Sequence, residues 1–297
     1  MNPILRTVRR LGQRAVDNAL GVTKNTGMLP EDLEQCTDLA FPAGDGTALA
    51  ADLYWKKDRG DEPMPVAVMV HGGGLFTGSR HTNRAFCEIL ARKGFLVYAP
   101  DYRLLDTADG FGEIADVFAS LMFLGRRLAE FNGDPQRVYL FGESAGAWLS
   151  VYAAAATENV HLRRLFGCPD PLLSLRGLIG FSGMYYTTRR DPLGLIYRKD
   201  LYGERRKRPS VTELMDPEHP EVVSSLPPVF LTSSENDFLK SYSLRYAEAL
   251  QAQGHSCELL YFPKGKDLTH AFPSLRPELP ESKMALERIL GWMQELR

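Results

Sequence analysis

The sequence predicts an α/β fold in which a mostly parallel, twisted sheet is flanked by helices. Short, continuous apolar runs recur along the chain, and such runs are typical of strands buried on both faces. Segments with helical spacing separate these runs, and this alternation favours crossover connections between parallel strands. The 297 residues, 44% of them hydrophobic, can bury a large core and exclude a disordered or disulfide-stapled chain.

The predicted strands share runs of β-branched, leucine and aromatic residues. In chain order they are 48–54 at an early sheet edge, 66–70, 95–99, 138–141, 177–181, 229–232 and 257–262. The predicted helices share apolar residues at helical spacing or, in one case, a run of alanines. They are 83–93, 114–128, 145–156, 242–253 and 283–296.

Three segments lie outside this alternation. Residues 1–20 show helical spacing with four arginines, which predicts a helix that packs on its own domain or, alternatively, contacts a membrane surface. Residues 23–35 are polar and predict a linker. Residues 184–228 are rich in Pro and Gly and too long for an ordinary connection, so we expect a functional insertion there.

Charge and cysteine content exclude several classes of function. The formal net charge of −2 gives no reason to expect nucleic acid, and the basic run 205–208 is either a solvated face or a contact for an acidic partner. The four cysteines form no CxxC pair, so we expect no structural metal, and two disulfides are possible but not required. No apolar segment reaches 18 residues and no signal-like run is present, so we expect a cytoplasmic protein, either monomeric or homodimeric.

The strongest chemical motif follows the predicted strand 138–141. Residues 142–146 read Gly-Glu-Ser-Ala-Gly, a G-x-S-x-G sequence between a strand and an alanine-rich helix. A tight strand-to-helix turn of this kind holds the serine backbone in a strained conformation and exposes its hydroxyl at the helix N-terminus. Ser144 is therefore the predicted nucleophile.

A glycine run follows the predicted strand 66–70 directly. Residues 71–74 read His-Gly-Gly-Gly, and such a run can turn backbone N–H groups towards one point. With the N–H of Ala145, the N–H groups of Gly72 and Gly73 would stabilise an oxyanion. A phosphate-binding loop is excluded because no GK[ST] or GxGxxG pattern is present. We expect His71 to brace the loop rather than act as a base.

A serine nucleophile needs a general base and an acid that orients it, in the chain order Ser, acid, His. Asp237 follows the strand 229–232 and is the predicted acid, with Glu235 as the alternative. His270 follows the strand 257–262 and is the predicted base. His255 precedes that strand, at the wrong end of the sheet.

With these residues in place, the sequence resembles the α/β-hydrolase fold and, within it, the hormone-sensitive-lipase-like esterases. The matching segments are 71–74, 101–104 (Asp-Tyr-Arg-Leu), 142–146, 237–239 (Asp-Phe-Leu) and 270–272 (His-Ala-Phe), and the resemblance covers roughly residue 42 to the C-terminus. The sequence departs from the family in lacking A-P-E after Tyr-Arg-Leu and in having Glu143 where Asp is usual. We expect Asp101 and Arg103 to brace the loop.

The resemblance implies a carboxylesterase without cofactor or metal. Ser144, Asp237 and His270 would be nucleophile, orienting acid and base, and Gly72, Gly73 and Ala145 would form the oxyanion hole. It also implies a helical cap, formed by residues 1–35 and the insertion 184–226, over a hydrolase core of 36–183 and 227–297. Tyr and Leu residues of the insertion would line an acyl pocket for short to medium chains.

Three alternatives stay open at this point. The same triad could cleave amides or carbamates, which need protonation of a nitrogen leaving group. The fold could serve a non-catalytic protein that binds small molecules, although all three triad candidates are present. The basic N-terminal segment could make the protein a membrane-associated lipase.

Overall fold

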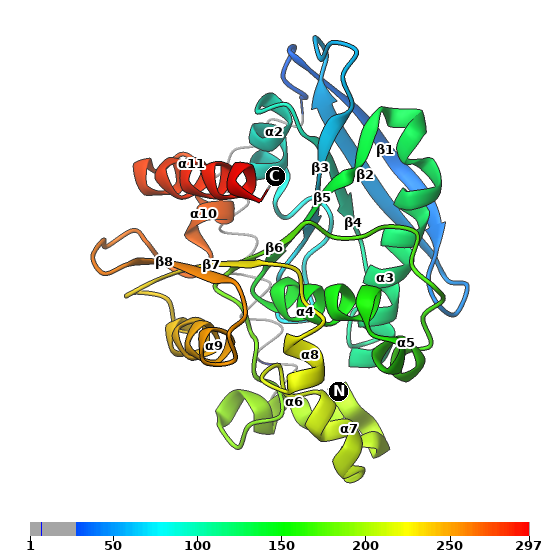
Figure 1. Ribbon diagram of the computed structural model, residues 1–297, viewed down its shortest axis with the longest axis vertical. Coiled ribbons are helices and arrows are strands. Elements are labelled where there is room, and N and C mark those ends of the chain that lie inside the picture. Colours follow the sequence, from blue (N-terminus) through cyan, green and yellow to red (C-terminus); the bar gives the residue numbers. More distant parts are fainter. Residues whose placement is uncertain (1–6, 8–27, 297) are drawn as a thin grey trace.

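The computed structural model describes residues 7 and 28–296, and their centre is one eight-stranded sheet (Figure 1). The strands are β1 (Leu33–Pro42), β2 (Ala48–Lys56), β3 (Met64–Val70), β4 (Leu96–Pro100), β5 (Gly133–Glu143), β6 (Gly177–Phe181), β7 (Val229–Ser234) and β8 (Cys257–Phe262). Their order is β1-β2-β4-β3-β5-β6-β7-β8. The pairs β1–β2 and β2–β4 are antiparallel and the others are parallel, which confirms the predicted fold class.

Helices cover both faces of the sheet (Figure 1). The helices of the core are α2 (Arg84–Arg92), α3 (Gly110–Arg127), α4 (Ala145–Glu158), α5 (Val160–Phe166), α9 (Lys240–Ala252), α10 (Phe272–Leu275) and α11 (Pro280–Glu295), with a 3₁₀ turn η1 (Leu128–Phe131) after α3. Helices α3, α4 and α9 pack on one face, and α2 and α11 pack on the other. The central parallel strands between them are therefore buried on both sides, whereas every residue of the edge strand β8 is partly exposed.

The alternation of side chains in β3 shows how each strand serves both faces. Val66, Val68 and Val70 belong to the apolar cluster that contains α3 and α4, whereas Ala67 and Met69 belong to the cluster that contains α2 and α11. Because successive side chains of a strand point to opposite faces, a strand between two helical layers must be apolar throughout. This is the origin of the continuous apolar runs in the sequence.

The sheet edge differs from the prediction. The outermost strand is β1, so residues 48–54 do not form the edge, and the expected linker 23–35 ends inside β1, which begins at Leu33. Strand β1 carries only Leu33 and Phe41 as buried side chains and is bulged between Cys36 and Leu39, so it lacks an apolar pattern. Apart from Thr7, the predicted helix at 1–20 lies outside the described residues.

The insertion forms short helices between β6 and β7. They are α6 (Pro192–Tyr202), the 3₁₀ turn η2 (Gly203–Lys207), α7 (Pro209–Leu214) and α8 (Pro220–Val223). Helix α6 reaches the loop after β3, where the Tyr197 hydroxyl donates to the Gly74 carbonyl at 2.8 Å. Much of the basic run is paired nearby, since Arg205 bonds Asp109 at 2.6 Å.

The four cysteines are free, and the described residues hold no cluster of His, Cys, Asp and Glu that could bind a metal ion. Within the same residues, no helix is long and apolar enough to cross a membrane.

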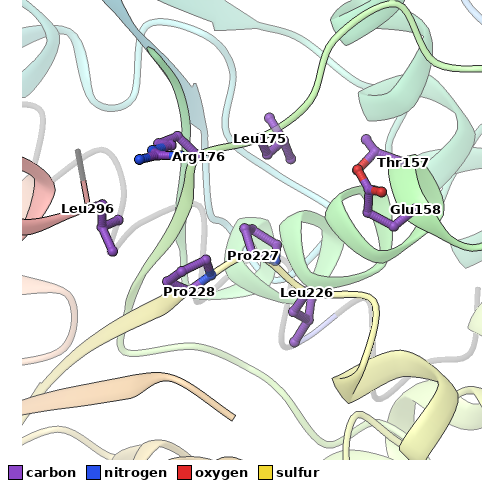
Figure 2. A pocket seen from close by; sticks show the side chains of 8 residues that line it. All are labelled: Thr157, Glu158, Leu175, Arg176, Leu226, Pro227, Pro228 and Leu296. Atoms are coloured by element: carbon purple, nitrogen blue, oxygen red, sulfur yellow. The ribbon is translucent and has the colours of Figure 1, made fainter. Parts of the chain in front are cut away.

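A pocket of about 310 Å³ lies at the amino edge of the sheet (Figure 2). It is lined by the end of α4 and by the segments that lead into β6 and β7, including Thr157, Glu158, Leu175, Arg176, Pro227 and Pro228. The predicted catalytic residues follow the opposite, carboxyl ends of the strands. This pocket is therefore separate from the candidate site.

Candidate active site

Ser144 lies on a sharp turn between β5 and α4. Its backbone has φ 52° and ψ −115°, a conformation that L-residues rarely adopt. The Ser144 N–H donates to the Phe181 carbonyl at 2.9 Å, and the Ser144 carbonyl accepts from the N–H of Met184 at 2.9 Å. These bonds to β6 and the segment after it hold the strained turn in place.

The glycines on either side of this turn leave room for its backbone. A Cβ on Gly142 would lie 2.5 Å from the Ala147 Cα, and a Cβ on Gly146 would lie 2.3 Å from the Val70 carbonyl oxygen. Neither position tolerates a side chain without displacement of backbone atoms. Strand β3 and helix α4 therefore approach closely enough to place Ser144 beside the loop that follows β3.

Asp237 and His270 meet at the carboxyl ends of β7 and β8. His270 Nδ1 lies 2.7 Å from Asp237 Oδ1. Asp237 is buried and also accepts from the Ser233 hydroxyl at 2.8 Å and the Leu239 N–H at 2.9 Å. Burial alone would raise the pKa of Asp237, but the hydrogen bond and charge of His270 and the other donors lower it below its usual value.

The structure separates Asp237 from the other candidates of the sequence. Glu235 is exposed and bonds Lys240 and Tyr261, so its carboxylate does not face His270. His255 Nε2 lies 3.0 Å from the Pro227 carbonyl at the amino edge of the sheet. The chain order predicted Asp237 as the acid, and its contact with His270 distinguishes it from Glu235.

The His270 loop is bonded to the segment beside the serine turn. The Ala271 N–H donates to the Ser182 hydroxyl at 2.9 Å, and Ser182 follows Phe181, the partner of the Ser144 N–H. Within the described residues, Ser144 Oγ forms no hydrogen bond with His270. Such bonds often tighten only when substrate binds. Ser144 and the His270–Asp237 pair are thus tied to the same stretch of backbone.

The loop after β3 is braced by His71. This side chain is buried, its ring stacks on Tyr102 with centroids 4.2 Å apart, and its Nδ1 lies 2.8 Å from the Gly72 carbonyl. Burial lowers the pKa of His71. The Tyr102 hydroxyl donates to the His71 carbonyl at 2.9 Å. A buried, stacked imidazole fits the expected bracing role.

Two further side chains of this region also act as braces. Asp101 accepts from the Arg80 N–H at 2.7 Å, and Arg103 Nε donates to Asp116 at 2.7 Å. These contacts agree with the structural role expected for Asp101 and Arg103.

Gly72 lies directly against Glu143, the residue before the serine. A Cβ on Gly72 would lie 2.5 Å from Glu143 Oε1. The N–H groups of Gly73 and Gly74 have no hydrogen-bond acceptor among the described residues. Gly72 and Gly73 stay the predicted donors of this loop.

Ala145 occupies the position expected of the other donor. It is the first residue of α4, where backbone N–H groups have no acceptor within the helix and the helix dipole favours negative charge.

Two side chains near the site, Asn83 and Phe238, were not singled out by the sequence. Asn83 donates to Glu143 at 2.6 Å. Tyr197, one of the insertion tyrosines expected to line the pocket, contacts the glycine loop through Gly74. Phe238 is 72% exposed, and its ring lies over His270 with centroids 4.3 Å apart. The sequence held only two signals for these side chains: Glu143, where the family usually has Asp, and the Phe next to Asp237. Of the expected pocket residues, Leu195 is exposed, whereas Tyr185 and Tyr186 are buried in packing.

A parallel sheet with a strained serine turn after one strand and an Asp–His pair after two later strands defines the class of α/β hydrolases. The family model described as alpha/beta hydrolase fold matches residues 67–274, so the chain belongs to this family. The resemblance predicted from the motifs is confirmed.

Individual relatives point in the same direction. The chain is 27% identical to carboxylesterase NlhH of Mycobacterium tuberculosis over 266 residues, 82% of this chain and 77% of that protein. It is 28% identical to the isoprenylcysteine alpha-carbonyl methylesterase ICME of Arabidopsis thaliana over 239 residues, 77% of this chain and 56% of that protein. The chain therefore spans about half the length of the plant methylesterases it matches.

Among solved structures, esterase B from Lactobacillus rhamnosis, inhibited by a tributyrin phosphonate, matches with a TM-score of 0.87 and 25% identity. The match covers 98% of this chain and 94% of that one.

Proposed function

We propose that this protein hydrolyses carboxylic esters through Ser144, His270 and Asp237. The observation that carries the proposal is the 2.7 Å contact between His270 Nδ1 and Asp237 Oδ1, on a loop bonded to the segment that holds the serine turn. The similarity to carboxylesterase NlhH and to esterase B supports the ester bond as the target. Amide or carbamate cleavage by the same residues is the alternative that the test must exclude.

In the proposed acylation, Ser144 Oγ attacks the ester carbonyl carbon while His270 Nε2 takes its proton. Asp237 accepts a hydrogen bond from His270 Nδ1, which selects the tautomer with a free Nε2 and stabilises the imidazolium that forms. His270 then gives its proton to the alcohol oxygen as the carbon–oxygen bond breaks. The alcohol leaves and the acyl group stays on Ser144.

The oxyanion of the tetrahedral intermediate is stabilised by the Ala145 N–H and by the glycine loop. Gly72 and Gly73 are the loop donors we propose, and the N–H groups of Gly73 and of the neighbouring Gly74 have no acceptor among the described residues. Each well-placed donor contributes about 2.7–4 kcal/mol to such a transition state. In deacylation, His270 takes a proton from water as the water oxygen attacks the acyl carbon. The bond from this carbon to Ser144 Oγ then breaks, His270 returns the proton to Ser144 Oγ, and the carboxylic acid leaves.

We further propose acyl chains of short to medium length and a cap formed by residues 1–32 and 184–226; residues 33–35, which we expected in the cap, belong to β1 instead. Support for short chains comes from esterase B, which is inhibited by a tributyrin phosphonate. Support for a cap comes from α6, whose Tyr197 contacts Gly74 of the loop that carries the proposed oxyanion donors.

The test is a series of p-nitrophenyl esters from acetate to laurate, with Ser144→Ala as control. We expect hydrolysis by the native chain, a fall in kcat/KM beyond hexanoate, and no measurable turnover by Ser144→Ala. Full activity in that variant would contradict the assignment. Matching anilides separate esterase from amidase activity, and failure of a fluorophosphonate to label the protein would indicate a non-catalytic binding protein.

A further inference from the structure

Glu143 lies between the serine turn and the glycine loop and contacts both. Its Oε2 accepts from Asn83 Nδ2 at 2.6 Å, and its Oε1 packs against Gly72, where a Cβ would lie only 2.5 Å away. Glu143 is the last residue of β5 and directly precedes Ser144, whereas Gly72 follows β3 and Asn83 precedes α2. One carboxylate therefore bridges three separate elements.

Both side chains of this link are almost completely buried, Glu143 being 3% and Asn83 2% exposed. A buried carboxylate is costly unless hydrogen bonds satisfy it. Burial raises the pKa of Glu143, while the hydrogen bond from Asn83 and the charge of His270 oppose this shift. Because burying this carboxylate costs free energy, we infer that its position serves to hold its partners in place.

Asn83 is committed to this link rather than to its helix. It occupies the position that precedes α2, where Asn commonly caps the first turn. Its side chain makes no capping hydrogen bond, and its amide points to Glu143 instead. The fit at Gly72 is equally specific, because any Cβ there would lie 2.5 Å from Glu143 Oε1.

We propose that Glu143, held by Asn83, is a positioning residue that sets the oxyanion loop at its working distance from Ser144. The inference rests on the proposed ester hydrolysis. The proposed donors lie on two elements, Ala145 on α4, and Gly72 and Gly73 on the loop after β3. Glu143 is covalently joined to Ala145 through Ser144 and packs against Gly72, so it sets the separation between the two elements.

The test compares Glu143→Gln, Asn83→Ala and the double variant with the native chain. Glutamine keeps the size of the side chain but replaces one oxygen with an NH₂ group, which would face either the Asn83 amide or Gly72. Asn83→Ala removes the donor and leaves the carboxylate. Glu34→Gln is the matched control, because Glu34 also accepts a side-chain bond, from Trp55 Nε1 at 2.9 Å, but on edge strand β1.

We expect Glu143→Gln to lower kcat for p-nitrophenyl butyrate by about 10- to 100-fold, the range expected when reacting groups shift by up to 1 Å. KM should stay within about twofold, since the oxyanion forms only after binding. Asn83→Ala should lower kcat in the same way but less, and the double variant should lose less than the product of the two single losses.

A second readout does not depend on activity. Amide hydrogen exchange of the peptide 71–78 should be faster in Glu143→Gln and in Asn83→Ala and unchanged in Glu34→Gln. If the native chain cleaves no ester, the proposed function fails, whereas slow native exchange that the substitutions accelerate still supports the link itself.

Three results would overturn the proposal. The first is a kcat within twofold of native in Glu143→Gln. The second is a kcat reduced in Glu143→Gln but native in Asn83→Ala, which would assign Glu143 an effect through its charge on His270. The third is unchanged exchange over 71–78 in both variants. If Glu143→Gln does not fold, Asn83→Ala alone decides through its kcat and exchange.

Discussion

The serine turn and the insertion after β6 both belong to the carboxyl side of the sheet, but they are held in different ways. In the turn, residues 142–146 are confined by backbone atoms, and Gly146 has no room for even a Cβ. The insertion is held by side chains, such as Tyr197 on the Gly74 carbonyl at 2.8 Å and Tyr186 on Glu218 at 2.7 Å.

This difference indicates which positions of the fold tolerate substitution and which do not. Crowded backbone cannot be repacked around a new side chain without moving the reacting groups. A side-chain contact can be lost singly, at the modest cost of one hydrogen bond. We therefore expect substitutions at the carboxyl edge of the core to act on the chemistry, and substitutions at the insertion to act mainly on stability.

The largest expected effect is that of Asp237→Asn. An amide in place of the carboxylate favours the wrong His270 tautomer, and in a serine protease this change lowers kcat about 10⁴-fold with little change in structure. We expect a loss of similar size for p-nitrophenyl butyrate, measured with urea unfolding on the same sample. Activity within tenfold of native would show that Asp237 does not orient the base.

Gly146→Ala should break the serine turn. Its Cβ would lie 2.3 Å from the Val70 carbonyl oxygen, so α4 must move away from β3. We expect kcat to fall about 100-fold and the free energy of unfolding to fall by about 1–3 kcal/mol.

The matched control for this prediction is Gly291→Ala in α11. The nearest atom to its Cβ is Arg288 Nη1 at 3.9 Å. This change should stabilise the protein by up to about 1 kcal/mol through helix propensity and leave kcat unchanged. Equal effects of Gly146→Ala and Gly291→Ala would contradict the claim that crowded backbone confines the serine turn.

Glu113→Gln tests the packing beneath the insertion, where α3 meets α6. Both carboxylate oxygens of Glu113 are buried without a hydrogen-bond partner among the described residues, unlike those of Glu143. Burial, followed by the charge of Asp116, raises the pKa of Glu113 well above its usual value.

The folded state thus keeps a proton on Glu113 that the unfolded state releases above about pH 4.3. Stability should fall as pH rises through this window, by about 1.4 kcal/mol for each pH unit until the folded-state pKa is reached. Glu113→Gln removes this loss, so its melting temperature should exceed that of the native chain at pH 8 and match it near pH 4. A difference that does not depend on pH would contradict the raised pKa.

The smallest effect is expected for Tyr197→Phe, which removes the tether of α6 to Gly74. We expect a loss of about 0.5–1.5 kcal/mol in urea unfolding. The value of kcat/KM should fall by no more than about threefold, because a side-chain contact at the insertion acts mainly on stability.

Tyr246→Phe is the control for this tether. Its hydroxyl is buried and has no partner in the described part of the chain, so its removal should not lower stability. A loss of activity above tenfold in Tyr197→Phe would show that the insertion is as critical to the chemistry as the core.

Much of the fold could be predicted because its signals are local. Each parallel strand contains a short apolar run, and the predicted helices 83–93 and 145–156 differ from α2 and α4 by no more than two residues at either end. Strand β1 was not predicted, because an edge strand of this kind is apolar only where it contacts the core. The short helices of the insertion carry too few turns for a periodic pattern.

The sequence by itself determined the order of strands and helices, the strained turn at Ser144 and the chain order of the candidate residues, because periodicity and turn chemistry depend on neighbours along the chain. Only the tertiary structure decided that Asp237, not Glu235, faces His270, that Glu143 packs against Gly72, and that Asn83 donates to Glu143. These contacts depend on which strand ends lie side by side in the sheet, and that arrangement is set by packing over the whole chain.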